Sequence, residues 1–121
     1  MSDLRIRGLN HASVRISDLA RSRAFYEGLL GLTTAPRPDL GVPGTWYDLR
    51  GAQLHLIQGE AMPVDIDPSG PHLALEVESV AEVKRLLDAR GIPYRDFGGP
   101  QLWLHDPDGN VVEICEARSP R

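Results

Sequence analysis

Polar and apolar residues alternate over His11–Ile16, the first patterned segment of the chain. This two-residue period predicts a half-buried β-strand with its apolar side chains on one face. Ser17 and Asp18 then provide a helix N-cap, and an apolar pattern of helical period continues up to Gly31, which predicts an amphipathic helix. Short apolar runs between turn residues predict three more strands in this half, over residues 32–35, 45–49 and 53–58.

The same order of elements returns in the second half of the chain. Residues 59–71 contain several Pro and Gly and have no apolar period, which is typical of a linker. A strand is then expected over residues 72–77, followed by a helix that Ser79 caps and Gly91 ends. The other strands of this half are predicted over residues 92–97, 101–105 and 111–116. Each half therefore has the order β-α-β-β-β.

Equivalent positions in the two halves are separated by a nearly constant number of residues. His72 follows His11 by 61 residues. Glu113 follows His55 by a similar 58 residues. A half of about 50 residues is too small to bury an adequate core alone. We therefore expect the two halves to pack together, within one chain or across a dimer.

Four side chains that can bind a metal occupy repeat-related positions, namely His11, His55, His72 and Glu113. Successive residues of a strand point to opposite faces, and the apolar neighbours of these four face the helices, so all four are expected on the opposite face. Three imidazoles and a carboxylate suit one divalent transition-metal ion such as Zn, Ni, Co, Mn or Fe(II). We predict that these residues bind such an ion, with His55 either in direct contact with it or orienting another ligand.

The same alternation assigns five other side chains to the lining of a pocket. Aromatic walls with a few polar groups are the usual lining of a small-molecule site. Arg15 would suit an anionic group of the substrate, and His105, the remaining histidine, is expected to be exposed at the end of a strand. The predicted substrate-binding residues are Ser13, Arg15, Trp46, Gln53 and Trp103.

Composition and charge narrow the class of protein. A chain of 121 residues is about one domain, and its formal charge of −4 argues against nucleic acid as a partner. The chain has no run of about 18 apolar residues, no apolar signal segment at its start and only one cysteine. We therefore expect a cytoplasmic protein without a membrane-spanning segment or an internal disulfide. Nucleotide-binding and serine-hydrolase motifs are absent as well.

The strongest family signal lies in three segments, LNHASVRISDLARSRAFYEGLLGL, GPHLALEVESVAEVKRLLDARGIPY and LHDPDGNVVEICE. They resemble the vicinal-oxygen-chelate superfamily, which comprises glyoxalase, bleomycin-resistance and extradiol-dioxygenase proteins, and the resemblance extends from about Arg7 to Ala117. It implies an α+β, glyoxalase-like fold for a single domain over residues 1–121. Two tandem βαβββ modules, about 7–58 and 72–117, would form a curved, barrel-like mixed sheet. Small members often complete their cup across a homodimer, so a homodimer is expected.

The resemblance also implies roles at the metal site. The glyoxalase-like ligands, carried over position by position, fall on His11, His55, His72 and Glu113. The family's metal chelates two neighbouring substrate oxygens. Metal-bound carboxylates transfer protons in glyoxalase-like isomerases, which implies that role for Glu113. Bacterial glyoxalase I has a glutamate at the position of His55, so this chain departs from its pair of carboxylates.

The sequence leaves two kinds of function open, an enzyme and a non-catalytic binding protein. The favoured one is a metal-dependent enzyme that acts on a small oxygenated substrate by isomerase, lyase or thiol-addition chemistry. Ring-opening dioxygenation is less favoured, because extradiol dioxygenases are usually longer. The alternative is a non-catalytic protein that binds a small molecule or drug on the same fold. Bleomycin-binding members lack metal ligands, so the retention of all four ligands here favours the enzyme.

Overall fold

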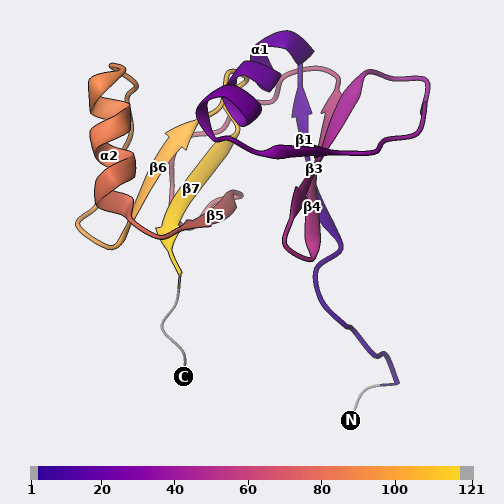
Figure 1. Cartoon of the computed structure of the whole chain (residues 1–121), viewed down its shortest axis with the longest axis horizontal. Coiled ribbons are helices and arrows are strands. Elements are labelled where there is room, and N and C mark those ends of the chain that lie inside the picture. The colour runs from indigo at the N-terminus through magenta and orange to yellow at the C-terminus, as the bar shows by residue number, and fades with distance from the viewer. Residues whose placement is uncertain (1–2, 118–121) are drawn as a thin grey trace. The chain divides into compact units, whose positions relative to one another are not determined.

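A computed structural model describes residues 3–117 of the chain, which belong to two compact units (Figure 1). The first unit is Met1–Glu60 and the second is Ala61–Arg121. Each contains a small mixed β-sheet and a helical segment, so the predicted α+β fold class is confirmed. Among the described residues, no helix is long and apolar enough to cross a membrane.

The elements of the first unit are β1 (His11–Ile16), α1 (Leu19–Arg23), η1 (Ala24–Leu29), β2 (Thr33–Ala35), β3 (Gly44–Leu49) and β4 (Ala52–Gln58). Its four strands form one sheet in the order β1-β4-β3-β2. Strands β1 and β4 run parallel, and the other neighbours are antiparallel. A parallel pair needs a long connection between its strands, and the helical segment, β2 and β3 all lie within that connection.

The helix predicted for the first half consists of a short α-helix, α1, and a π-helical segment, η1. Asp18 caps its start, because the carboxylate accepts a hydrogen bond of 3.2 Å from the Arg21 backbone N–H. Gly31 follows its end in the left-handed conformation, with a φ of 72°. The wider turn is visible where the Leu30 N–H donates to the Phe25 carbonyl at 2.9 Å. Both ends were predicted from the sequence, but the change of pitch was not.

A buried tyrosine holds this helical segment on the first sheet. Tyr47 of β3 is fully buried, and its hydroxyl donates to Glu27 Oε2 at 2.8 Å. Arg23 Nε pairs with the same carboxylate oxygen at 2.7 Å. Burial and the bond to Glu27 raise the pKa of Tyr47, and the hydrogen bond from Arg23 lowers the pKa of Glu27. The other fully buried side chains of this unit are Ile16, Ser22, Tyr26, Leu54 and Leu56.

The elements of the second unit are β5 (Leu73–Val77), α2 (Val80–Ala89), β6 (Gln101–His105) and β7 (Val111–Glu116). The sheet order is β5-β7-β6, with β5 parallel to β7 and β6 antiparallel to it. Ser79 caps α2, since its hydroxyl accepts the Glu82 N–H at 3.2 Å, and Gly91 follows the helix with a φ of 66°. The buried apolar side chains of this unit are Val80, Leu87, Leu102, Trp103, Leu104, Val111, Val112 and Ile114.

The strand predicted over residues 92–97 is wrong, because the structure has a single β-bridge there. Arg95 pairs with Trp103 of β6 through two backbone hydrogen bonds of 2.7 and 2.9 Å. Pro93 has no N–H to donate, so the ladder does not extend on that side. Gly98, with a φ of 93°, turns the chain on the other side. The strand predicted from residue 72 also begins one residue later, at Leu73.

The hairpin between β6 and β7 closes around the Asp106 carboxylate. Its Oδ1 accepts the backbone N–H of Asp108 at 2.9 Å and that of Asn110 at 2.8 Å. Gly109 adopts a φ of 82°, and a Cβ added there would lie 2.5 Å from the Cβ of Pro63. The glycine therefore lets the segment after residue 60 lie directly against the hairpin.

Candidate functional site

Two histidine rings and a tryptophan ring stack on one face of the first sheet. His55, in β4, lies between the rings of His11 and Trp46. Its ring centroid is 4.2 Å from that of His11 and 4.1 Å from that of Trp46, with interplanar angles of 16° and 5°. The strand register explains the stack. Ser13 and Trp46 both lie opposite His55 in neighbouring strands, and His11 shares the face of Ser13.

Hydrogen bonds to neighbouring polar side chains orient the His55 ring. Only 8% of His55 is exposed, and its Nε2 lies 2.8 Å from Gln53 Oε1. Because an amide oxygen can only accept, Nε2 donates and Nδ1 keeps its lone pair. Gln53 Nε2 donates in turn to Asp48 at 3.2 Å. Burial, followed by the nearby charges of His11 and Arg37, lowers the pKa of His55, which favours the neutral ring that metals bind.

The second unit pairs His72 with Glu113. His72 Nε2 is 3.2 Å from Glu113 Oε1, and the two side chains are 25% and 16% exposed. Trp103 lies opposite Glu113 in the neighbouring strand, and its ring meets that of His72 at a steep angle, with centroids 4.8 Å apart. The buried indole Nε1 of Trp103 has no hydrogen-bond partner among residues 3–117. The pair therefore lies beside an unsatisfied hydrogen-bond donor.

His11 and His72, at equivalent repeat positions, present the same ring nitrogen. His11 Nδ1 lies 2.7 Å from Asn10 Oδ1, and His72 Nδ1 lies 2.8 Å from the Gly70 carbonyl oxygen. Both partners are acceptors, so each Nδ1 donates its proton to a hydrogen bond. When the ring is neutral, the lone pair is then on Nε2, and in His72 this nitrogen faces Glu113 Oε1. Metal-binding imidazoles commonly have their second nitrogen tied in this way. The donor set therefore fits a divalent transition metal.

The two ligand pairs occupy equivalent places in their sheets. His55 lies opposite Trp46, and Glu113 lies opposite Trp103. In the strand on the other side, His55 lies opposite Ser13 and Glu113 lies opposite Ala74. Each of these partners follows the candidate histidine of its own unit by two residues. In the part of the chain that the structure describes, no three His, Cys, Asp or Glu side chains form a metal-binding group. Within each unit the predicted ligands thus form a pair.

The other predicted pocket residues have different surroundings. Trp46, Gln53 and Trp103 lie against the candidate ligands. Ser13 is exposed on β1. Arg15, also on β1, lies over Gly59, where an added Cβ would be 3.0 Å from the Arg15 Cδ. The side chain predicted to bind an anion therefore packs along the backbone that follows β4.

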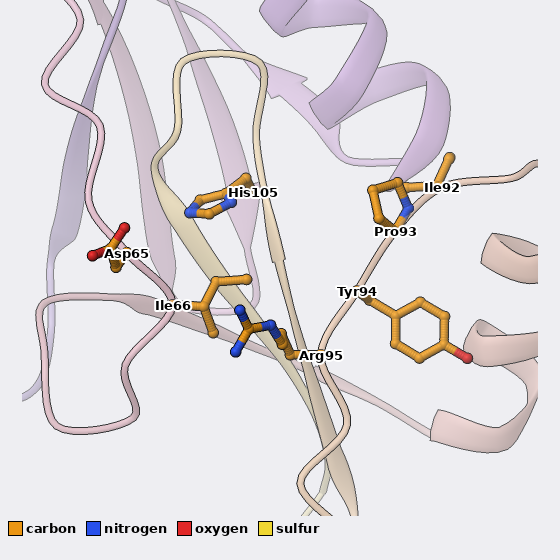
Figure 2. A pocket seen from close by; sticks show the side chains of 7 residues that line it. All are labelled: Asp65, Ile66, Ile92, Pro93, Tyr94, Arg95 and His105. Carbon is orange, nitrogen blue, oxygen red and sulfur yellow. The ribbon is translucent and has the colours of Figure 1, made fainter.

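A pocket of about 640 Å³ in the second unit was not predicted from the sequence. In Figure 2 the side chains of His105 and Arg95 point toward the side of Asp65 and Ile66, and Tyr94 points the other way. Opposed residues of neighbouring strands share a face. The pairing of Arg95 with Trp103 would therefore have identified Arg95 as a residue on the face of Trp103. The sequence does not show that register. The lining residues are Asp65, Ile66, Ile92, Pro93, Tyr94, Arg95 and His105.

A repeated α+β module with a candidate ligand pair in each copy defines a class of small proteins with a glyoxalase-like fold. The family model for the Glyoxalase/Bleomycin resistance protein/Dioxygenase superfamily matches residues 8–114. The chain belongs to this superfamily, so the resemblance drawn from its sequence is confirmed.

Known proteins similar to this chain include enzymes. The protein named Glyoxylase I 4 of Arabidopsis thaliana is 34% identical over 129 residues, which cover 96% of this chain and 74% of that protein. Lactoylglutathione lyase of Salmonella typhimurium is 30% identical over 125 residues, which cover 91% and 93%. The solved structure of the fosfomycin resistance protein FosX of Listeria monocytogenes, in complex with Mn(II) and sulfate, has a TM-score of 0.73 at 18% identity. That match covers 94% of this chain and 95% of the FosX chain, and it shows a shared fold.

Proposed function

We propose that this protein is a metal-dependent enzyme in which His11, His55, His72 and Glu113 together bind one divalent transition-metal ion. The main support for this proposal is that the four residues form two pairs, one in each sheet, and that the pairs occupy equivalent positions in the strand registers. Mn(II) is present in the FosX structure, and the donor set equally suits Zn, Ni, Co or Fe(II). When bound, such an ion would polarise substrate oxygens as a Lewis acid.

Glu113 is the proposed proton-transfer residue. Its carboxylate is partly exposed and lies beside the His72 ring, so it can accept a proton from a substrate bound in front of it and return that proton later. The ligand set contains one carboxylate, which supplies a single base. A single base suits isomerase, lyase or thiol-addition chemistry in which one proton moves at a time.

The substrate is proposed to be a small oxygenated molecule. Trp46 and Trp103 would provide flat apolar walls on either ligand pair. The unsatisfied indole N–H of Trp103 supports contact with a polar ligand atom. Ser13 and Arg15 would offer a hydroxyl and a cation from β1. Gln53 has a second proposed role, because its amide oxygen already holds the His55 ring.

We also propose that the protein works as a cytoplasmic homodimer. Its single cysteine excludes an intramolecular disulfide, which suits a reducing compartment. Each unit contributes two of the four proposed ligands, and a second copy of the chain would bring the complementary pairs in a symmetric assembly.

Metal titration of protein purified without chelator tests the ligand set. We expect about one bound ion per chain for at least one of Mn(II), Co(II), Ni(II), Zn(II) and Fe(II). His72→Ala and Glu113→Ala should each weaken binding by about tenfold or more, because each removes a metal-binding atom. His105→Ala is the matched control, since His105 contacts Val64 instead of a candidate ligand. Undiminished binding in Glu113→Ala, or no uptake of any of these ions, would overturn the assignment.

Turnover separates the proposed enzyme from the alternative, a non-catalytic binding protein on the same fold. The metal-loaded protein would be given a glutathione hemithioacetal or an epoxide with a thiol, and products would be followed by NMR. A product that forms about 100-fold more slowly in Glu113→Gln would support the enzyme, because a positioned acid–base group contributes at least that factor. Ligand binding without any product would support the alternative.

A further inference from the structure

The pocket of the second unit combines a cationic side chain with an apolar wall (Figure 2). Its volume of about 640 Å³ lies in the range of small-molecule sites. Ile66 and Ile92 contribute apolar surface, and Arg95 contributes the positive charge. Asp65 and His105 add polar groups to the lining. The pocket therefore has the composition of a site for a small charged molecule with an apolar part.

Arg95 is available to a ligand. Among residues 3–117 its guanidinium has no hydrogen-bond or ion-pair partner, whereas Arg23 is paired with Glu27. The Arg95 backbone is held by both hydrogen bonds to Trp103, so the side chain starts from an ordered position. A guanidinium presents a planar fork of donors that matches a carboxylate.

Strand register places Arg95 on the same face as Glu113. Arg95 lies opposite Trp103, and Trp103 lies opposite Glu113. Directly opposed residues share a face. Neighbouring strands are about 4.8 Å apart, so about 10 Å separates the backbones of Arg95 and Glu113. A small organic molecule with one ring or a short chain spans that distance.

His105 and Asp65 restrict the kind of anion. His105 Nε2 donates to the Val64 carbonyl at 2.7 Å, so the neutral ring keeps Nδ1 as an acceptor for a ligand hydroxyl. The Asp65 carboxylate belongs to the same lining and repels a second negative charge. A monoanion with a hydroxyl group fits these surroundings better than a phosphate dianion does.

We propose that this pocket binds the carboxylate of a small hydroxycarboxylate substrate, with Arg95 as the carboxylate-binding residue. The rest of the molecule extends along the same face toward Trp103 and Glu113. Only this second part rests on the proposed function, because carboxylate binding by the pocket needs no metal. This carboxylate contact is separate from Arg15, which packs over Gly59, because Arg95 lines the pocket of the second unit.

Mandelate tests the pocket, with mandelamide as its uncharged counterpart. Both molecules carry a ring and a hydroxyl group, and they differ in the carboxylate. The full chain, isotope-labelled and without added metal, would be titrated while the arginine Nε–H signals are followed by NMR. We expect mandelate to shift the Arg95 signal saturably. Mandelamide should bind about tenfold more weakly, because it lacks the charge-assisted hydrogen bonds to Arg95.

Variants of two arginines make the test specific. Arg95→Gln should weaken mandelate binding by about tenfold and leave mandelamide binding unchanged. Arg95→Lys, which keeps the charge but loses the planar fork, should lie in between and guards against misfolding of the glutamine variant. Arg90→Gln is the control, because Arg90 follows α2 and does not line the pocket. It should bind mandelate as the wild type does.

Several results would overturn the proposal. One is the absence of saturable mandelate binding, and another is equal binding of mandelate and mandelamide. A third is an equal loss of mandelate affinity in Arg95→Gln and Arg90→Gln. The last is tighter binding of α-hydroxybenzylphosphonate than of mandelate. Metal binding by Arg95→Gln should match the wild type. A protein that binds mandelate but no metal would refute the proposed function alone. A protein that binds metal but not mandelate would refute the pocket alone.

Discussion

At the scale of single residues, hydrogen bonds decide which ring nitrogens are free for a metal. The acceptor on Nδ1 leaves Nε2 available in His11 and turns Nε2 of His72 toward Glu113 Oε1, whereas Gln53 on Nε2 leaves Nδ1 available in His55. The His55 ring also stacks on both of its faces. It cannot turn without losing both ring contacts and a hydrogen bond, so its orientation depends on neighbours more than that of the two exposed histidines.

Gln53→Ala is expected to weaken metal binding by about tenfold, a typical effect of losing the residue that orients a ligand. It should also change the visible absorption spectrum of the Co(II)-loaded protein, which reports ligand geometry. Gln53→Glu keeps an acceptor oxygen for His55 Nε2 but turns the donor to Asp48 into a second carboxylate oxygen, so it should restore both properties only in part. Gln58→Ala, an exposed change on the same strand, is the control. An unchanged spectrum and an unchanged metal affinity in Gln53→Ala would show that Gln53 does not orient the His55 ring for metal binding.

At the scale of elements, the two units attach their helices to their sheets in different ways. The first unit uses the Tyr47–Glu27–Arg23 hydrogen bonds. The second uses the apolar face of α2 and a bond of 3.2 Å from the Val80 N–H to Glu116 Oε1 on β7. These attachments do not involve the candidate ligands, so they can be changed without touching a metal-binding atom.

Tyr47→Phe should lower the free energy of unfolding by about 1 kcal/mol, the usual net value of a buried hydrogen bond, and leave metal affinity unchanged. Urea unfolding followed by circular dichroism measures the free energy of unfolding, and calorimetry measures the metal affinity. Tyr94→Phe is the matched control, because the Tyr94 hydroxyl makes a bond of 3.0 Å to Asp88 at an exposed position. Tyr94→Phe should change the free energy of unfolding by no more than about 0.5 kcal/mol. Equal losses in the two variants would show that the buried hydrogen bond of Tyr47 stabilises the fold no more than the exposed one of Tyr94.

The same hydrogen bonds predict a pH dependence. Arg23, and to a smaller extent Tyr47, lowers the pKa of Glu27 below its ordinary value of 4.5. A carboxyl group with a lowered pKa in the folded state stabilises the protein above its unfolded pKa, and this contribution is lost as pH falls. Unfolding curves between neutral pH and about pH 3 should therefore show a smaller loss in Glu27→Gln than in the wild type. A loss of the same size in both would show that Glu27 contributes nothing to acid destabilisation.

At the scale of the whole molecule, the repeat predicted most of the elements, because strand alternation and helix caps are local properties. The convergence of all four candidate ligands on one ion stays a prediction. The strand over residues 92–97 could not be predicted correctly, since Pro93 removes a donor and pairing depends on a distant partner, Trp103. The pocket was missed for a related reason. Its lining comes from three segments, around Ile66, Arg95 and His105, which become neighbours only when the strands pair.

The repeat also makes a prediction about two copies of the chain. If each site of the proposed homodimer joins the first unit of one chain to the second unit of the other, defects in different units should complement each other. One variant would carry His11→Ala and His55→Ala, and the other His72→Ala and Glu113→Ala. Neither should bind metal alone.

Mixing the two variants during refolding gives the decisive comparison. Random assembly makes about half of the dimers mixed, and each mixed dimer has one complete site out of two, so about a quarter of wild-type metal binding should return. Two pairs of ligands from the same chain cannot give this recovery, because every chain in the mixture has lost one pair. No recovery, or a monomer in sedimentation at micromolar concentration, would therefore reject the shared site and leave the four ligands to be supplied by one chain.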